Sequence, residues 1–389
     1  MSGETQFGFI KGLGTREALF SMKLLVQKCY DQRQNVFICF IDYQKAFDNV
    51  KHDLLISRLR EIGIDDKDVR IIKQLYFGQS AEIRIRRDLL TQEFNIAKGV
   101  RQGGVLSPML FNIYVEKIFQ IALEGVDTGI KINGKPINNI RYADDTAILA
   151  NNLEDLQDIL DRVTEVGEQF GLSINITKTK MMIISRQEFN NINLTINGEA
   201  IERVAKFKYL GATLNEKWDC DEEVKIRIGT AKTTYLKMKN ILLQRTLPVC
   251  LRLRVIKCYI WPILLYGVET WSLKVRTLKR IEAFEMWTLR RMLRISWTEH
   301  ITNDDVLLRA GVERELLNIV KQRKTSYLGH ILRGSRYFIP KLIVQGKIEG
   351  RRGPGRKQHS WLRNIREWCG IPDAGSIFRH AENNTLVIQ

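Results

Sequence analysis

The sequence has few cysteines and no pattern among them. Its 389 residues include six Cys, and no two of these form a Cys-x-x-Cys pair. This scarcity argues against a disulfide framework and against a cysteine zinc site. It favours a reducing compartment inside the cell.

Long hydrophobic runs are also missing. The most apolar stretch, residues 258–268, contains Pro262 and ends before Glu269, so it is too short to span a bilayer and indicates a buried helix. The N-terminus does not have the pattern of a secretory signal, and the chain has no internal repeat and no long low-complexity tract. The sequence therefore predicts no membrane partner.

Acidic residues are scarce in only one part of the chain. The whole sequence has 61 Lys+Arg and 44 Asp+Glu, a net charge of +17. Residues 1–210 hold 28 basic and 27 acidic residues, which leaves 33 basic and 17 acidic residues beyond residue 210. The first part is thus nearly neutral, while the second carries about +16. Such an imbalance is typical of a surface that follows a phosphate backbone.

Two adjacent carboxylates stand out in the nearly neutral part. The sequence Tyr142-Ala143-Asp144-Asp145 lies between short apolar, β-branched segments, which predicts a β-hairpin with the two Asp at its tip. Two ionised carboxylates held together repel each other unless a cation lies between them. The tetrapeptide alone is consistent with either a solvated turn or a metal site.

A third carboxylate follows a run of six apolar residues. Residues 36–41 (VFICFI) predict a strand buried on both faces, and Asp42 comes directly after it. An Asp at the end of a buried strand needs a hydrogen-bond network or a hard cation. Carboxylates shared with substrate phosphates are the ligands that Mg²⁺ prefers. Three carboxylates from two adjacent strands could therefore hold two Mg²⁺ ions and support nucleotidyl transfer.

The order of these and further motifs resembles the reverse transcriptases of non-LTR (LINE-type) retrotransposons. The segments that carry the resemblance are residues 6–9 (QFGF) with Gly12, Gly14 and Thr15, then 40–42 (FID), 45–48 (KAFD), 99–112 (GVRQGGVLSPMLFN), 142–145 (YADD), 171–175 (GLSIN), 178–180 (KTK) and 207–211 (FKYLG). Each match is weak alone, but their shared order and spacing make the resemblance specific. It implies an RNA-directed DNA polymerase.

The resemblance assigns roles to eleven residues. Those expected to be catalytic are Asp42, Asp144, Asp145 and Lys178, with the three Asp holding two Mg²⁺ ions, for which Mn²⁺ could substitute. Those expected to bind the nucleotide are Phe47, Gln102, Gly103 and Tyr142, with Phe47 as an aromatic gate against a ribose 2′-hydroxyl. Those expected to form the primer grip are Tyr209, Leu210 and Gly211.

Several of these residues also have plainer interpretations. Phe47 could be a core aromatic beside a strand. Lys178 could be the general acid for the leaving pyrophosphate, a phosphate contact or a solvated lysine. Gly103 could belong to a simple turn before a helix that begins near Ser107, and the 209–211 segment could be a tight turn after a strand.

The expected fold is an α/β (α+β) palm-fingers core followed by an all-helical, thumb-like region. The predicted division is residues 1–215 for an incomplete fingers and palm, 216–335 for the helical region, and 336–389 for a basic linker and a short helix. Apolar periodicity predicts helices near residues 16–31, 52–76, 108–124, 153–170, 221–243, 249–266, 273–295 and 361–368, and a hairpin of 82–86 with 93–97. The Gly- and Arg-rich segment 346–357 could follow a phosphate backbone or be a solvated linker.

The implied partners are an RNA template, a DNA primer or RNA–DNA hybrid, and deoxynucleoside triphosphates. Such a protein would work in the nucleus or in a cytoplasmic ribonucleoprotein. Full-length elements of this type usually carry an endonuclease and more finger segments upstream, so we expect an N-terminally truncated chain. The alternative is a catalytically weak or inactive remnant that still binds nucleic acid. The sequence does not fix an oligomeric state.

Overall fold

The computed structural model describes residues 3–87, 89–190, 192–350 and 360–388. The chain divides into two compact units, one of residues 1–210 and 342–353, and the other of residues 211–341 and 354–389. The predicted three-part division did not anticipate that residues 342–353 belong with the first unit. Part of the Gly- and Arg-rich segment, residues 351–357, lies outside the described residues.

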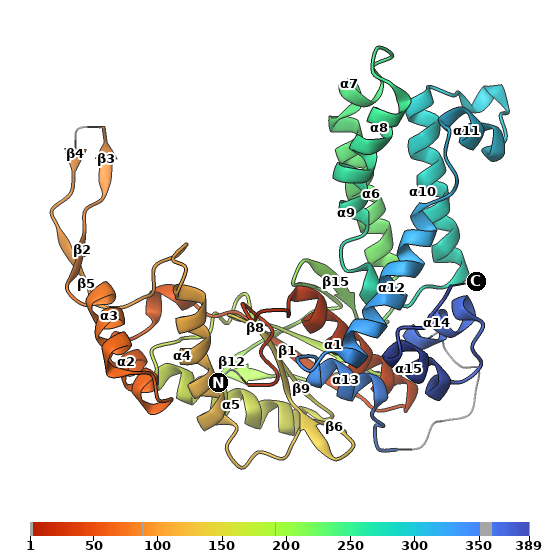
Figure 1. The fold of residues 1–389 in the computed structure, drawn as a ribbon. Helices are drawn as coiled ribbons and strands as arrows, with labels where there is room; N and C mark the ends of the chain where they lie inside the picture. The colour runs from red at the N-terminus through yellow and green to blue at the C-terminus, as the bar shows by residue number, and fades with distance from the viewer. Residues whose placement is uncertain (1–2, 88, 191, 351–359, 389) are drawn as a thin grey trace. The chain divides into compact units, whose positions relative to one another are not determined.

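A five-stranded sheet forms the centre of the first unit (Figure 1). Its order is β13 (Glu202–Arg203), β10 (Lys180–Ile184), β1 (Val36–Ile41), β9 (Asp145–Ala150) and β8 (Asn139–Tyr142). The pairs β10–β1, β1–β9 and β9–β8 are antiparallel, whereas β10–β13 is parallel. The sheet places β1 beside the β8–β9 hairpin, although about a hundred residues separate them in the sequence.

Strand β1 is buried along its whole length, as its six apolar residues predict. Successive side chains of a strand point to opposite faces. Phe37, Cys39 and Ile41 join a core that includes apolar residues of α4 (Ser107–Ala122) and α5 (Leu153–Gln169). On alternate positions, Phe40 stacks on Phe207 with ring centroids 4.3 Å apart. The helix α1 (Thr15–Asp31) also contacts β1 and β8.

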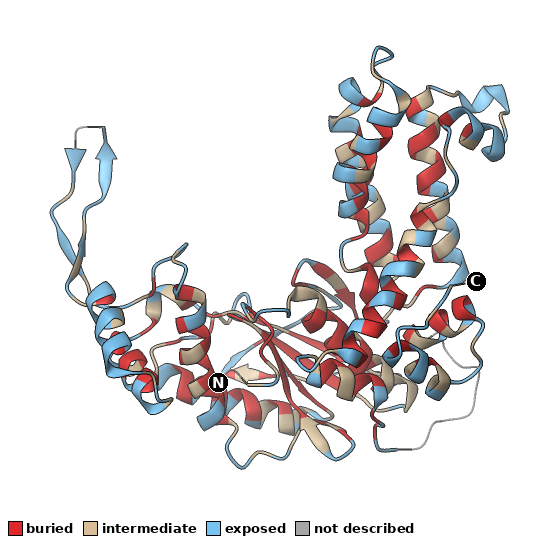
Figure 2. Cartoon of the chain, viewed as in Figure 1, coloured by how far each residue is buried: buried red, intermediate tan, exposed pale blue. Residues whose placement is uncertain are grey.

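The finger-like part contains two helices and an exposed ribbon. The predicted helical stretch 52–76 is two helices, α2 (His52–Glu61) and α3 (Asp66–Tyr76), because Gly63 takes a φ of +81° and Asp65 caps α3. The predicted hairpin is present, but its pairing differs from the predicted 82–86 with 93–97. Strand β2 (Gln79–Ala81) pairs with β5 (Phe94–Ile96), and β3 (Arg84–Arg86) pairs with β4 (Leu89–Leu90). Figure 2 shows this ribbon exposed, in contrast to the buried central sheet.

Short elements complete the first unit. They are η1 (Ala46–Asn49), the hairpin of β6 (Ile130–Ile132) with β7 (Lys135–Ile137), the hairpin of β11 (Thr195–Ile196) with β12 (Glu199–Ala200), and β14 (Lys206–Tyr209). The returning segment is tied to this unit, since Ile348 bridges to Ile132 and the Lys28 Nζ donates to the carbonyls of Val344 and Gly346. The part of the expected linker that is described, 346–350, therefore contributes to the packed unit.

The second unit is helical after β15 (Ala212–Asn215), which confirms the predicted fold class. Its elements are α6 (Asp221–Lys237), α7 (Lys239–Leu242), α8 (Val249–Val255), the π-helix η2 (Ile256–Ile260), α9 (Trp261–Leu264), η3 (Val268–Thr270), α10 (Val275–Leu293), η4 (Trp297–Glu299), α11 (Asn303–Ala310), α12 (Leu316–Arg333), α14 (Trp361–Cys369) and α15 (Ala374–Glu382). The helix α13 (Phe338–Gln345) spans the boundary between the units. None of the helices in the described ranges is both long enough and apolar enough to cross a membrane.

The core of the second unit encloses a lysine. Lys324 on α12 is fully buried, and its Nζ donates to the Asn364 Oδ1 at 2.7 Å. The rings of Trp361 and Trp368 on α14 lie 5.2 Å from the same nitrogen. The predicted amphipathic helix at 361–368 thus docks on α12. Burial lowers the pKa of Lys324 well below its ordinary value.

Candidate active site

The paired carboxylates lie at the tip of the β8–β9 hairpin, as predicted. Tyr142 pairs with Asp145, so Ala143 and Asp144 form the two-residue turn and Asp145 begins β9. Ala143 is buried and has a φ of +57°, a conformation that residues other than Gly rarely adopt. Both Asp side chains are exposed at this tip.

The pairing of β1 with β9 brings Asp42 to the same edge of the sheet. Ile41 pairs with Thr146, so the next residue along β1 lies beside the start of β9. The Asp42 N–H donates to the Thr179 Oγ1 at 3.2 Å, and its carbonyl accepts from the Asn175 N–H at 2.7 Å. These bonds fix the backbone of Asp42 against the 171–180 segment, which follows α5.

The electrostatics of the three carboxylates are those of a site that attracts cations. Although Asp145 is accessible at the tip, the protein around its carboxylate partly desolvates it and raises its pKa to about 6, and the charges of Asp144 and Asp42 add to the shift. The pKa of Asp144 is also raised, first by burial and then by the charge of Asp42. A divalent cation among these oxygens would remove the mutual repulsion and favour the ionised forms.

The side chains do not form a ready-made coordination group. Within the described ranges, no set of three or more His, Cys, Asp or Glu side chains is placed so that it could hold a metal ion. The three carboxylates nevertheless suit Mg²⁺ in chemistry, because they are oxygen donors on adjacent strands whose charges interact. Their role as metal ligands stays a prediction.

Lys178 lies next to this group. Its Nζ is 3.8 Å from the Asp42 Oδ2, and 69% of its side chain is exposed. An exposed ion pair of this length contributes little to stability, so stabilisation of the fold does not explain why Lys178 lies beside Asp42. Its position near the carboxylates is compatible with the predicted roles of general acid and of phosphate contact.

The four residues expected to bind the nucleotide have different surroundings. The half-buried Phe47 stacks on Phe111 of α4, with centroids 4.3 Å apart and planes at 15°. Gln102 is exposed, and its Nε2 lies 3.5 Å from the Asp48 Oδ1. Gly103 has a φ of +85° and open space where a Cβ would be, so backbone conformation explains the glycine there. Tyr142 lies beside Phe9, with centroids 6.1 Å apart.

The segment expected to be a primer grip supports the β8–β9 hairpin. Tyr209 is buried, and its hydroxyl lies 3.1 Å from the Ile140 carbonyl oxygen and 3.3 Å from that of Asp145, so it donates to the β8–β9 backbone. Leu210 and Gly211 follow with φ of +46° and +76°. Two successive positive φ values are typical of a tight turn, which agrees with the plainer interpretation of this segment.

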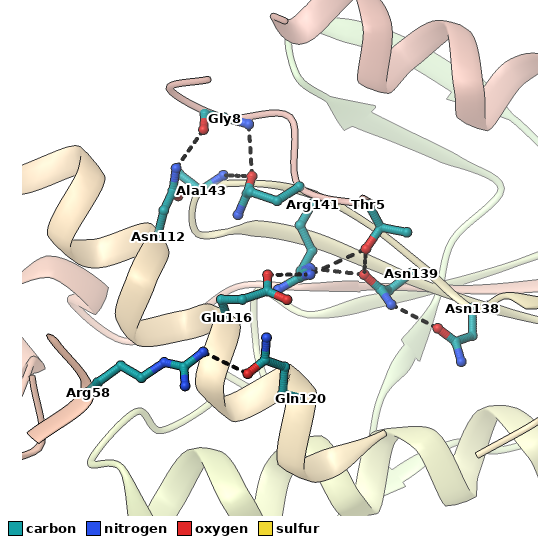
Figure 3. A network of polar contacts seen from close by, with 11 residues as sticks. Thr5, Gly8, Arg58, Asn112, Glu116, Gln120, Asn138, Asn139, Arg141 and Ala143 are labelled. Carbon is teal, nitrogen blue, oxygen red and sulfur yellow. Dashed lines mark hydrogen bonds and ion pairs between the residues drawn. The ribbon is translucent and has the colours of Figure 1, made fainter. Parts of the chain in front are cut away.

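Sequence reasoning missed a buried ion pair directly behind the hairpin (Figure 3). Arg141 on β8 is buried, and its Nη2 lies 3.0 Å from the Glu116 Oε2 of α4. Its Nε donates to the Asn139 Oδ1 at 2.9 Å, and its guanidinium lies 4.2 Å from the Phe119 ring. The available signal in the sequence was a charged residue on the apolar face of β8 and another on that of α4. The sequence alone did not show that Arg141 and Glu116 contact each other, because the fold brings them together.

Comparison with known proteins agrees with this site. The family model described as "Reverse transcriptase (RNA-dependent DNA polymerase)" matches residues 2–214, more than half of the chain. The chain belongs to the reverse transcriptase family. The match covers the three carboxylates, the nucleotide-binding set and the 209–211 segment.

Curated relatives of this reverse transcriptase chain come from mobile elements. It is 26% identical over 301 residues to the "RNA-directed DNA polymerase from mobile element jockey" of Drosophila funebris, which covers 75% of this chain and 32% of that protein. It is 24% identical over 305 residues to the "Retrovirus-related Pol polyprotein from type-1 retrotransposable element R2" of Popillia japonica, covering 75% and 41%. The chain thus spans about a third to two fifths of the length of these relatives.

A solved structure with some likeness is the telomerase from Candida albicans in complex with a fragment of telomeric RNA. The two are 11% identical with a TM-score of 0.41, and the match covers 89% of this chain and 56% of that one. A score this low carries no argument about function. The relation to non-LTR retrotransposon proteins therefore depends on the family match and the curated relatives.

Proposed function

We propose that this chain is an RNA-directed DNA polymerase of a non-LTR retrotransposon, which extends a DNA 3′ end on an RNA template. The observation that carries the proposal is the meeting of Asp42, Asp144 and Asp145 at one edge of the sheet in a member of the reverse transcriptase family. The raised pKa values of Asp144 and Asp145 support it, because carboxylates that repel each other at a surface favour a bound cation.

The three carboxylates would hold two Mg²⁺ ions, and Mn²⁺ could replace them. The ions would supply activation of the primer 3′-hydroxyl and stabilisation of the leaving pyrophosphate. Around them, Lys178 would face the leaving phosphates, and Phe47 would restrict the space beside the sugar. Gln102, Gly103 and Tyr142 would line the nucleotide site, and the segment 209–211 would hold the hairpin and the primer end.

The basic second unit would bind the backbone of the template and primer. The excess positive charge lies beyond residue 210, and exposed lysines on and just after α6 include Lys225, Lys237 and Lys239. Lysines that neutralise phosphates release condensed counterions, so binding should weaken steeply as salt is added. All six cysteines are described and none is paired, which is compatible with work in a reducing compartment such as the nucleus or a cytoplasmic ribonucleoprotein.

A primer-extension assay tests the metal assignment. The full chain should extend a DNA primer on an RNA template with Mg²⁺ and deoxynucleotides. Asp144→Asn and Asp42→Asn should each lower the rate about 100-fold or more, because each removes a metal ligand, yet RNA–DNA hybrid binding should be unchanged. Asp158→Asn is the matched control, since Asp158 is exposed on α5 and pairs only with Arg162 among the contacts described. Extension at the parental rate by either active-site variant contradicts the assignment.

A second experiment examines sugar selection. Phe47→Val should admit ribonucleotides, because the smaller side chain leaves room for a 2′-hydroxyl. Single-nucleotide incorporation of matched ribo- and deoxynucleotides gives the discrimination ratio, which should fall by about 10-fold or more, equivalent to ~1.4 kcal/mol. An unchanged ratio would show that Phe47 serves only to pack on Phe111.

A catalytically inactive remnant is the second candidate. The observation that favours it is that the described side chains do not already form a metal-holding group. This candidate predicts salt-sensitive binding of an RNA–DNA hybrid without extension. It also predicts that Mg²⁺ with a matched deoxynucleotide does not raise the melting temperature, whereas an active site that binds them would be stabilised.

A further inference from the structure

The segment before α1 runs beside the strand that leads into the catalytic hairpin. The Phe7 N–H donates to the Arg141 carbonyl at 2.8 Å, and the Arg141 N–H donates to the Thr5 carbonyl at 2.9 Å. Gln6 and Arg141 form an isolated parallel bridge. Residues 5–7 therefore extend the central sheet beyond β8.

Gln6 lies at the centre of this contact. Its side chain is buried, and its Oε1 accepts two backbone hydrogen bonds, from the Ala143 N–H at 3.0 Å and from the Gly8 N–H at 2.8 Å (Figure 3). Ala143 is the residue directly before Asp144. The side-chain oxygen of Gln6 thus joins the N-terminal segment to the turn that carries Asp144, a predicted metal ligand.

The turn that Gln6 holds is strained and tightly packed. Ala143 has a positive φ and is buried, so the surrounding contacts must maintain this conformation. Gly8 lies against it so closely that an added Cβ would be 2.4 Å from the Ala143 nitrogen. Asn112 of α4 fixes Gly8 from the other side, since its Nδ2 donates to the Gly8 carbonyl at 2.6 Å.

Gln6 acts here as an acceptor. Within the described residues, its Nε2 is buried and has no hydrogen-bond partner. A buried donor without a partner is unfavourable, so stability alone does not explain an amide at this position. The side chain is better explained by what its carbonyl oxygen holds.

We propose that Gln6 is a positioning residue for the metal-binding carboxylates. It holds the peptide of Ala143, and through it sets the place of Asp144 relative to Asp42. Metal and substrate groups must be held to within about 0.5 Å for efficient chemistry, so the loss of this anchor should weaken metal binding. The inference depends on the proposed function, because it assumes that Asp144 is a metal ligand.

The test compares Gln6→Met with the parental protein. Methionine has a similar length and keeps the site apolar, but it cannot accept the two N–H groups. We expect Mn²⁺ binding to the full chain, measured by electron paramagnetic resonance titration without substrate, to weaken about 10-fold, and extension to slow by about 10- to 100-fold. RNA–DNA hybrid affinity should stay within about twofold, since the basic unit is unchanged.

Two further variants make the test specific. Gln120→Met is the matched control, because Gln120 is exposed on α4 and accepts from Arg58 instead of from the hairpin. Gln6→Glu keeps an acceptor oxygen and replaces the donor that has no partner with a carboxyl oxygen, which adds negative charge when ionised, so Mn²⁺ affinity should not fall by more than about threefold. If Gln6→Met does not fold, Gln6→Glu decides alone, and a large loss of Mn²⁺ affinity in the folded variant would overturn the proposal.

The outcomes separate this inference from the proposed function. Parental Mn²⁺ binding and extension in Gln6→Met, together with loss of both in Asp144→Asn, would overturn only the role of Gln6. If Asp144→Asn also binds Mn²⁺ as the parental protein does, the metal assignment itself fails. Weaker Mn²⁺ binding in folded Gln6→Met is the result that we expect, together with a lower melting temperature, because two buried backbone N–H groups lose their acceptor.

Discussion

Each of the two units buries a cation, and the two are held in different ways. Arg141 in the first unit has a carboxylate partner, Glu116, at 3.0 Å and further polar contacts. Lys324 in the second unit has an amide oxygen and two tryptophan rings around its nitrogen, and no carboxylate is among the contacts of this nitrogen in the described residues. A guanidinium keeps its proton when buried, so it needs a counter-charge, whereas a buried ammonium can become neutral.

This difference relates to what each region does. The Arg141–Glu116 pair links α4 to β8, the first strand of the hairpin that carries Asp144 and Asp145, where a fixed arrangement of charged groups is useful. The Lys324 cluster joins α12 to α14, where packing alone is needed. We therefore expect the first unit to depend on charge pairing and the second to depend on pH.

The largest effect should come from removing the carboxylate of the buried pair. Glu116→Leu leaves the Arg141 charge buried without its partner, so the free energy of unfolding should fall by about 3–5 kcal/mol. Urea unfolding followed by circular dichroism measures it. Adding Arg141→Met should recover much of the loss, whereas Asp158→Asn in an exposed pair should change stability by less than ~1 kcal/mol. A loss under ~1 kcal/mol in Glu116→Leu would contradict the comparison.

A smaller effect on the free energy of unfolding is expected at Lys324, and the size of this effect depends on pH. The folded-state pKa of Lys324 lies below the unfolded value of about 10.4, so the unfolded chain binds the proton more readily. Stability should rise as pH increases from the lowered pKa toward 10, by at most ~1.4 kcal/mol per pH unit. Lys324→Met should not show this rise of stability with pH. Its free energy of unfolding should differ least from that of the parental protein near pH 10.

Urea unfolding at pH 7, 8.5 and 10 measures this contribution as the difference between the two proteins. A difference that does not change with pH would mean that Lys324 has the same protonation state in both the folded and the unfolded chain. Lys257→Met provides the control, because Lys257 is a half-buried lysine of the same unit that is paired with Glu315.

Local patterns were sufficient to predict the elements that hold the candidate site. The apolar run 36–41 and the paired Asp residues predicted β1 and the β8–β9 hairpin, because a fully apolar strand and a polar turn have strong local signals. Helical stretches were predicted near residues 52–76 without a stated break point, and the structure places the break at Gly63 and Asp65, between α2 and α3. The helix at 249–266 contains a π-helical turn that apolar spacing does not reveal.

The partners of the candidate site could not be predicted from local patterns. Gln6, Glu116 and Tyr209 reach the hairpin from segments up to about 140 residues away in the sequence. Tyr209 illustrates the limit, because its motif indicated a primer contact, which stays a prediction, but gave no sign that its hydroxyl donates to the hairpin backbone. Which polar side chain meets which backbone group follows from the packing of the sheet.

The return of residues 342–350 to the first unit has a consequence for synthesis on the ribosome. Ile348 pairs with Ile132, and the Lys28 side chain donates to the carbonyls of Val344 and Gly346. Ile132 and Lys28 are synthesised early, whereas Val344, Gly346 and Ile348 are synthesised only after residues 211–341. At typical translation speeds the first unit waits on the order of 10 s for them. During that interval β6 lacks its bridge to Ile348, and Lys28 at the end of α1 lacks its two carbonyl acceptors. The nascent chain therefore has a defined period in which a chaperone or an early-binding RNA could act on it.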